Sequence, residues 1–84
     1  MEQNNPYKIY VETAAEFSAD GQLKPLWIIW EDGRKFEIDR VLRVERAASR
    51  KAGGIGLRYT VMIRGHEHHL YYEENYRWFV ERRE

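Results

Sequence analysis

Three histidines lie close together in the last quarter of the chain, and their spacing could place several imidazole ligands on one metal ion. They are His66, His68 and His69, with Glu67 between the first two. Imidazole nitrogens and a neighbouring carboxylate can hold zinc, nickel or copper. In an extended strand, however, His68 and His69 point to opposite faces, and no second cluster of metal-ligating residues stands out in this cysteine-free sequence. We therefore expect no metal ion and no other cofactor.

A glycine-rich segment is the second place where chemistry could occur. Residues 51–56 read Lys-Ala-Gly-Gly-Ile-Gly, which is similar to loops that cradle phosphate, but neither the P-loop pattern nor the dinucleotide-binding pattern is present. Ser49, Asp39 and His66 do not form a recognisable nucleophile motif. An enzyme would also need a sizeable pocket, which a fully packed small barrel rarely contains. We predict that the protein is not an enzyme and has no small-molecule substrate.

The basic side chains gather in the middle of the chain although the formal net charge is +0. Residues 33–66 hold nine basic and three acidic side chains, whereas the segments on either side are acidic. A local basic face of this kind could bind single-stranded nucleic acid, since arginine grips phosphate and stacks on bases. The alternative is that these arginines pair with acidic residues across strands and only keep the surface soluble. The candidate nucleic-acid or anion contacts are Arg46, Arg50, Lys51, Arg58 and Arg64.

Bulky apolar residues suggest a different function, the docking of a protein partner or of a second copy of the chain. An exposed edge strand or an apolar patch would provide the docking surface. We take Trp27, Ile29 and Phe79 as the candidate contacts. Docking on a protein partner is the function that we favour, and single-stranded nucleic-acid binding is the alternative.

The hydrophobic pattern predicts strands rather than helices over most of the chain. Residues 7–17 alternate with a period of two, as in a half-buried strand. Leu26–Trp30 is apolar on both faces, as in a central strand, and Asp32-Gly33 predicts a tight hairpin turn. Further strands are expected at residues 34–46, 57–64, 68–73 and 76–81, with a bend or bulge near residues 39–41 and a loop over residues 47–56.

These elements predict a single all-β domain over residues 7–81. Short strands and tight turns in 84 residues favour a five- to six-stranded antiparallel meander that closes into an SH3-like or OB-like barrel, because closure removes exposed edges. The alternative is an antiparallel sheet with one short helix near residues 40–51, where the pattern also fits a helical stripe. Residues 1–6 are expected to be disordered and residues 82–84 to fray.

Composition indicates a folded protein of the cytoplasm. Hydrophobic residues make up 43% and aromatic residues 14% of the chain, which is typical of globular domains. The start of the sequence has neither the basic nor the apolar region of a secretory signal. The longest apolar run, Leu26–Trp30, is far shorter than the roughly 20 residues that cross a membrane, so we expect no membrane contact.

Three segments of the sequence resemble a family of short uncharacterised bacterial proteins. They are Trp30–Leu42, Gly53–Val61 and Trp78–Glu81, and the resemblance covers most of residues 7–81. The segment Trp30–Leu42 also looks like small barrel proteins associated with Y-family translesion DNA polymerases. That second resemblance implies an accessory role in DNA repair. Neither resemblance implies a role for any particular residue.

Overall fold

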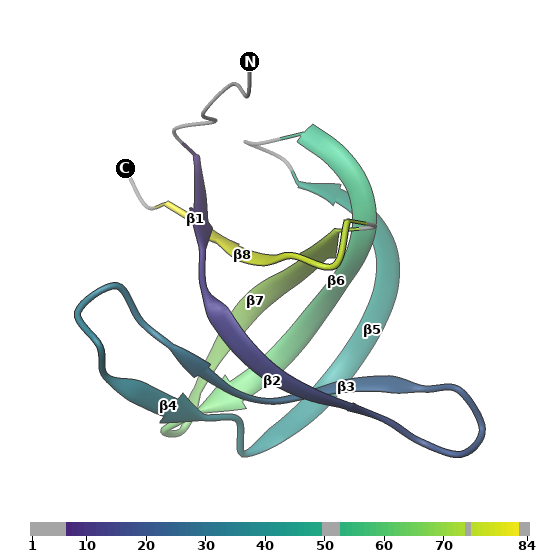
Figure 1. The fold of residues 1–84 in the computed structure, drawn as a ribbon, viewed down its shortest axis with the longest axis horizontal. Coiled ribbons are helices and arrows are strands. Elements are labelled where there is room, and N and C mark those ends of the chain that lie inside the picture. The colour runs from purple at the N-terminus through teal and green to yellow at the C-terminus, as the bar shows by residue number, and fades with distance from the viewer. Residues whose placement is uncertain (1–6, 50–52, 74, 83–84) are drawn as a thin grey trace.

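The protein folds into two antiparallel β-sheets, and the computed structural model describes residues 7–49, 53–73 and 75–82 (Figure 1). No helix occurs in these ranges. The five-stranded sheet has the order β1-β8-β7-β6-β5 and the three-stranded sheet the order β2-β3-β4. The strands are β1 (Lys8–Tyr10), β2 (Glu12–Phe17), β3 (Leu23–Ile29), β4 (Lys35–Glu37), β5 (Arg40–Ser49), β6 (Gly53–Ile63), β7 (His66–Glu73) and β8 (Trp78–Glu81). The predicted all-β fold is confirmed at this level.

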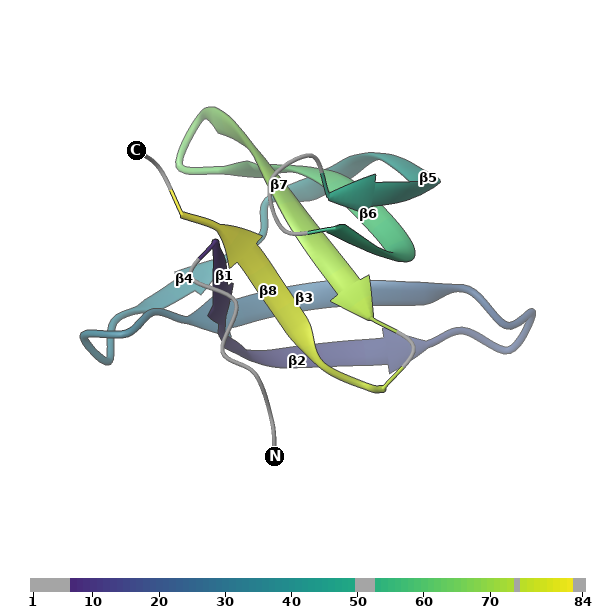
Figure 2. The same ribbon diagram turned by 90° about the horizontal axis from the view of Figure 1, so that it is seen from above.

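The chain passes from one sheet to the other at two corners. At the first corner, between β1 and β2, the Val11 amide donates to the Trp78 carbonyl at 3.1 Å. At the second, between β4 and β5, the Ile38 amide donates to Leu26 at 3.0 Å and the next amide, of Asp39, donates to Met62 at 2.8 Å. The backbone therefore stays hydrogen-bonded while it changes sheets, and the two sheets lie as facing layers (Figure 2).

The core lies between these layers and follows from strand alternation. Tyr59 is paired with Leu70 in the β6–β7 register, and both side chains point inward and are buried. Val61, Ile28 and Trp78 belong to the same buried cluster. The hydroxyl of Tyr59 donates to the Leu23 carbonyl at 2.7 Å, which provides the partner that a buried phenol needs. The β6–β7 hairpin is thus the centre of the packed interior.

The predicted turn at Asp32-Gly33 is confirmed. Gly33 has a φ of +88°, a conformation that glycine adopts without a steric penalty. The Trp30 amide donates to the Arg34 carbonyl at 2.8 Å and closes the hairpin between β3 and β4. The predicted bend near residues 39–41 is also present, as the second corner and as a register shift between Val41 and Arg43.

Two expectations for residues 40–56 are wrong. The helical alternative fails because Arg40–Ser49 is strand β5. The expected loop over residues 47–56 is mostly strand, since Ala47 pairs with Gly56 and Ser49 with Gly53. On the other side of β6, the glycine at position 56 permits the close approach of β7, because a Cβ atom at Gly56 would collide with the Tyr72 carbonyl oxygen. Residues 50–52 lie outside the described part of the chain.

The ends of the domain differ slightly from the expected boundaries. Residues 1–6 and 83–84, for which disorder and fraying were expected, lie outside the described ranges. Arg82 is described, and its amide donates to the Tyr7 carbonyl at 2.9 Å. Among the described residues, backbone hydrogen bonding therefore reaches Tyr7 at one end and Arg82 at the other.

Candidate functional site

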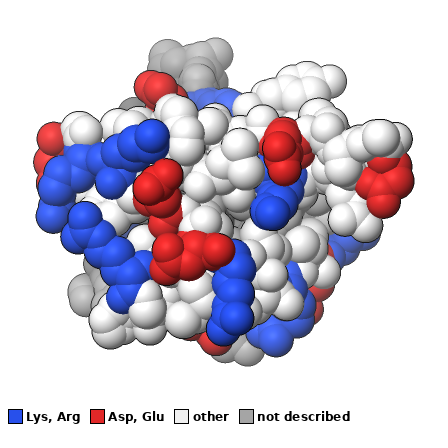
Figure 3. Space-filling model, turned by 90° about the horizontal axis from the view of Figure 1, so that it is seen from below, with Lys and Arg blue, Asp and Glu red and all other residues white. Residues whose placement is uncertain are grey.

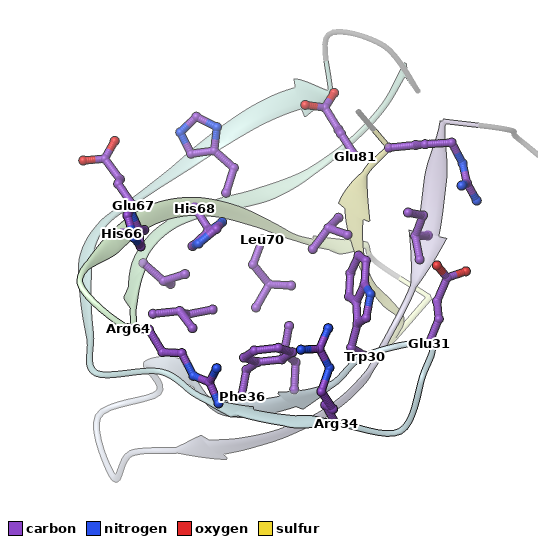
Figure 4. Close-up of a pocket in the computed structure, with 17 residues that line it drawn as sticks. Trp30, Glu31, Arg34, Phe36, Arg64, His66, Glu67, His68, Leu70 and Glu81 are labelled. Atoms are coloured by element: carbon purple, nitrogen blue, oxygen red, sulfur yellow. The ribbon is translucent and has the colours of Figure 1, made fainter. Parts of the chain in front are cut away.

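A groove of about 850 Å³ opens between the two sheets (Figure 4). Its floor is apolar and comes from inward-facing side chains of both sheets. Strand β4 has only three residues, whereas β6 has eleven and β7 has eight, so the three-stranded sheet leaves part of the β6–β7 hairpin uncovered. The floor residues are Ile9, Ile28, Val61, Ile63, Leu70 and Val80. The expectation that so small a domain leaves no sizeable pocket is therefore wrong.

One rim of the groove carries two arginines on either side of an aromatic ring. The guanidinium carbons of Arg34 and Arg64 lie 5.3 Å and 4.9 Å from the centroid of the Phe36 ring. Cations at this distance are attracted to the face of an aromatic ring. Figure 4 shows Arg64, Phe36, Arg34 and Trp30 following one another along this rim. The β3–β4 hairpin and the β6–β7 turn together position them.

Arg34 is held by an acidic neighbour on its own turn. Its Nε atom lies 2.6 Å from Oδ2 of Asp32, and its backbone amide donates to Oδ1 at 3.0 Å. The amide hydrogen bond, followed by the guanidinium, holds the pKa of Asp32 below its ordinary value. Arg64, in contrast, has no acidic partner within ion-pair distance among the residues that the structure describes.

The position of Arg64 depends on an unusual backbone conformation. Arg64 has a φ of +52° and Gly65 a φ of +78°, as in the two-residue turns that best fit the twist of a hairpin. Asparagine is the usual residue at the first of these positions, and a residue with a larger side chain is strained there. The left-handed conformation turns Arg64 out of the strand alternation and toward Phe36.

Histidines of β7 and the end of β8 form the opposite rim. His66 and His68 are paired with Ile63 and Val61 and so share the inner face with them. His69 is paired with Thr60 on the outer face, as strand alternation predicts. Figure 4 places His68 and Glu81 across the groove from Phe36. No group of three or more His, Cys, Asp or Glu residues that could hold a metal ion occurs in the described ranges.

The predicted basic contacts that the structure describes do not form one face. Arg58 lies on the outer face of the five-stranded sheet, where its Nη2 atom donates to Oε1 of Glu45 at 2.7 Å. This hydrogen bond is the main reason why the pKa of Glu45 is lowered and that of Arg58 is raised. Arg64 lies at the groove, and Arg46 is exposed on β5 opposite Leu57. Arg50 and Lys51 lie outside the described residues.

Charges of both signs are also mixed on other parts of the surface. Figure 3 views the molecule from the side of the three-stranded sheet, and Lys and Arg lie beside Asp and Glu over this face. Such mixing favours solubility over the attraction of a long polyanion. The pairing of Arg58 with Glu45 agrees with the soluble-surface interpretation of that residue.

The predicted apolar contacts lie on two different sheets. Trp27 and Ile29 are half-buried on the outer face of the three-stranded sheet, where Lys35 Nζ lies 4.8 Å from the Trp27 ring centroid. Phe79 belongs to the five-stranded sheet and is only 3% exposed. It stacks on Tyr71 with 4.9 Å between the ring centroids. Phe79 therefore offers no surface to a partner, whereas Trp27 and Ile29 stay partly exposed.

Sequence reasoning identified Arg64 as a candidate contact but missed most of the other residues that line the groove. Arg34 and Phe36 were assigned only to a strand and its turn, and His68 was considered only as a metal ligand. The available signal was the alternation of His66, His68 and Leu70, which shows that the inward face of one strand changes from polar to apolar along its length. Such a change is typical of a strand that leaves the core at an opening.

Comparison with family models, with curated proteins and with solved structures gives no match to this chain. The described residues contain no helix that is long and apolar enough to cross a membrane.

Proposed function

We propose that the domain is a small interaction module whose groove takes an extended segment of a protein partner. The observation that carries this proposal is the groove itself, which combines an apolar floor with a charged rim. Its volume of about 850 Å³ falls within the range of pockets that take ligands. Apolar surface that remains open and is surrounded by polar residues marks interaction sites in soluble proteins.

We also propose that the two sheets together form one small barrel. The first and last strands of the chain pair with each other, since Ile9 lies opposite Val80. If β1 with β2, and β4 with β5, are each counted as one bent strand, every strand pairs with its neighbour along the chain. This order supports a small barrel of the SH3-like or OB-like kind. The groove would then be the opening of that barrel.

A protein segment fits the groove better than single-stranded nucleic acid does. The lining contains Glu31, Glu67 and Glu81 together with three arginines, whereas grooves that follow a phosphate backbone are positively charged along their length. The floor can bury aliphatic or aromatic side chains, which provide most of the affinity in peptide grooves. Nucleic-acid binding, as an accessory protein in DNA repair, remains the alternative and is tested below.

Selection from a random heptapeptide library displayed on phage tests the proposal. We expect enriched peptides to shift the methyl NMR signals of Ile28, Val61 and Leu70 and to leave Ile29 on the outer face unchanged. Failure to enrich any peptide, or shifts confined to Ile29, would contradict it. In a parallel titration with oligothymidylate, binding that weakens steeply with salt would support the alternative.

A matched pair of variants localises the binding. Val80→Phe adds a ring at the groove floor and should weaken the enriched peptides. Val44→Phe makes the same change on strand β5, at a residue that is 47% exposed and does not line the groove. Equal effects of the two variants would exclude the groove as the binding site. Amide NMR spectra of both variants would verify that the fold is retained.

A further inference from the structure

We propose that the groove is specific for segments that carry an acidic side chain beside a bulky apolar one, and that Arg64, assisted by Arg34, holds the carboxylate. This inference rests on the proposed function and adds the chemistry of the partner. Three observations at the Phe36 rim carry it.

The first observation is that Arg64 lies against the Phe36 ring and has no acidic partner among the described residues. Its guanidinium lies 4.9 Å from the centroid of the Phe36 ring. Asp32 pairs with Arg34, and Glu45 pairs with Arg43 and Arg58, so these two carboxylates hold cations other than Arg64. A cation–π contact attracts the guanidinium to the ring without using its N–H groups as hydrogen-bond donors to an acceptor oxygen. The N–H groups of Arg64 can therefore donate hydrogen bonds to a carboxylate of another molecule.

The second observation is the strained backbone that places this side chain at the groove. In a regular strand, Arg64 would share the outer face with Arg58, because even-numbered residues of β6 alternate outward. The φ of +52° brings Arg64 to the rim instead. Strained backbone persists where the surrounding structure maintains it, and it is concentrated at binding sites. A turn without function would favour asparagine or glycine at this position.

The third observation concerns charge at the rim. Arg34 uses Nε for Asp32, which leaves the Nη1–Nη2 edge of its guanidinium for a second acceptor. Arg34, Arg64 and Asp32 together carry one net positive charge, which matches one carboxylate rather than a doubly charged phosphate. Glu31 is not counted in this sum, because it lies beyond Trp30 on the same rim (Figure 4).

The floor determines what accompanies the acidic group. Ile28 and Ile63 line the groove together with Phe36, so a ligand held at the rim would place its neighbouring residues over apolar surface. Burial of an aliphatic or aromatic side chain there would supply the hydrophobic part of the affinity. Acidic residues next to Leu, Ile, Phe or Trp are therefore the expected motif.

The enriched heptapeptides described above, together with two variants of the protein, test this inference. Arg64→Asn removes the guanidinium and suits the left-handed backbone, so the fold is retained. Arg43→Asn removes the same charge from strand β5, away from the groove. We expect an acidic residue in most enriched peptides and an affinity about tenfold or more weaker for Arg64→Asn, because a hydrogen bond to a charged group is lost. Arg43→Asn should leave the affinity unchanged.

A second comparison isolates the contact. Replacing the acidic residue of an enriched peptide by its amide should weaken binding to the native protein about tenfold or more and have little further effect on Arg64→Asn, since both changes remove the same interaction. Peptides that bind the groove but lack acidic residues, or that are insensitive to Arg64→Asn, would overturn this inference and leave the proposed function in place. Absence of any groove-binding peptide would overturn both.

Discussion

Arg64 and Phe36 meet at the rim of the groove, with 4.9 Å between the guanidinium carbon and the ring centroid. They come from different sheets, since Phe36 belongs to β4 and Arg64 follows β6. The contact therefore joins the turn of the β6–β7 hairpin to the three-stranded sheet that faces it. It depends on the left-handed backbone of Arg64, so conformational strain and a candidate binding contact occur at the same residue.

This coincidence predicts that Arg64→Asn increases stability while it weakens binding. Asparagine tolerates the left-handed conformation better than arginine does, and the relief of strain should exceed the loss of an exposed cation–π contact. We expect the free energy of unfolding to rise by about 0.5 kcal/mol in urea denaturation. In a Phe36→Leu background the cation–π contact is already absent, so the same change there measures the relief of backbone strain alone. A loss of about 1 kcal/mol or more would mean that the contact stabilises the fold more than the turn strains it.

Arg64 also shows why the sequence pattern predicted the strand but not the position of this side chain. Alternation correctly predicted strand over residues 57–63 of β6, because period-two burial is a local property of this segment. The same alternation places Arg58 and Arg64 on one face, and a common basic face was expected from it. The prediction failed at Arg64 because a turn residue with positive φ no longer follows the alternation of the strand.

Residues 47–56 were misread for a related reason. Glycine-rich sequence is typical of loops, but here Gly56 is required by the close approach of the Tyr72 carbonyl oxygen. The approaching carbonyl belongs to the next strand of the chain, β7, so the sequence around Gly56 does not reveal the contact. The groove was missed in the same way, since it arises from the relative lengths of β4, β6 and β7 rather than from a motif in any of them.

The buried hydroxyl of Tyr59 gives a second prediction. It donates to the Leu23 carbonyl at 2.7 Å, and Tyr59→Phe leaves that carbonyl without its partner. We expect a loss of about 1–2 kcal/mol in the free energy of unfolding. Tyr76→Phe is the matched control, because Tyr76 is 84% exposed, and it should change stability by less than about 0.5 kcal/mol. Equal values for the two variants would show that the Tyr59 hydroxyl contributes nothing.

Tyrosine ionisation predicts a loss of stability in alkaline solution. Burial raises the pKa of both Tyr59 and Tyr71 above the ordinary value of 10.0, and at Tyr71 the neighbouring Glu81 raises it further. The unfolded chain therefore releases these protons at a lower pH than the native protein does. The stabilising contribution is complete below about pH 10 and decreases as the pH rises through the native pKa values.

Urea denaturation at several pH values between about 9 and 11 measures this effect. The urea midpoint of the native protein should fall over this range, and that of Tyr59→Phe should fall less steeply. Tyr76→Phe again serves as the control. Parallel curves for the native protein and Tyr59→Phe would contradict the assignment to Tyr59.

Gly56→Ala tests why a glycine-rich sequence forms a strand in this protein. The added Cβ would collide with the Tyr72 carbonyl oxygen, which is backbone and can move only if the β6–β7 pairing opens. We expect the free energy of unfolding to decrease by about 2–3 kcal/mol. Gly21→Ala is the comparison, since Gly21 has a φ of +86° and open space around it, so only the backbone penalty of about 1–2 kcal/mol applies. Urea denaturation gives both values. If Gly56→Ala decreases the free energy of unfolding less than Gly21→Ala does, the close approach of β7 does not require glycine at position 56.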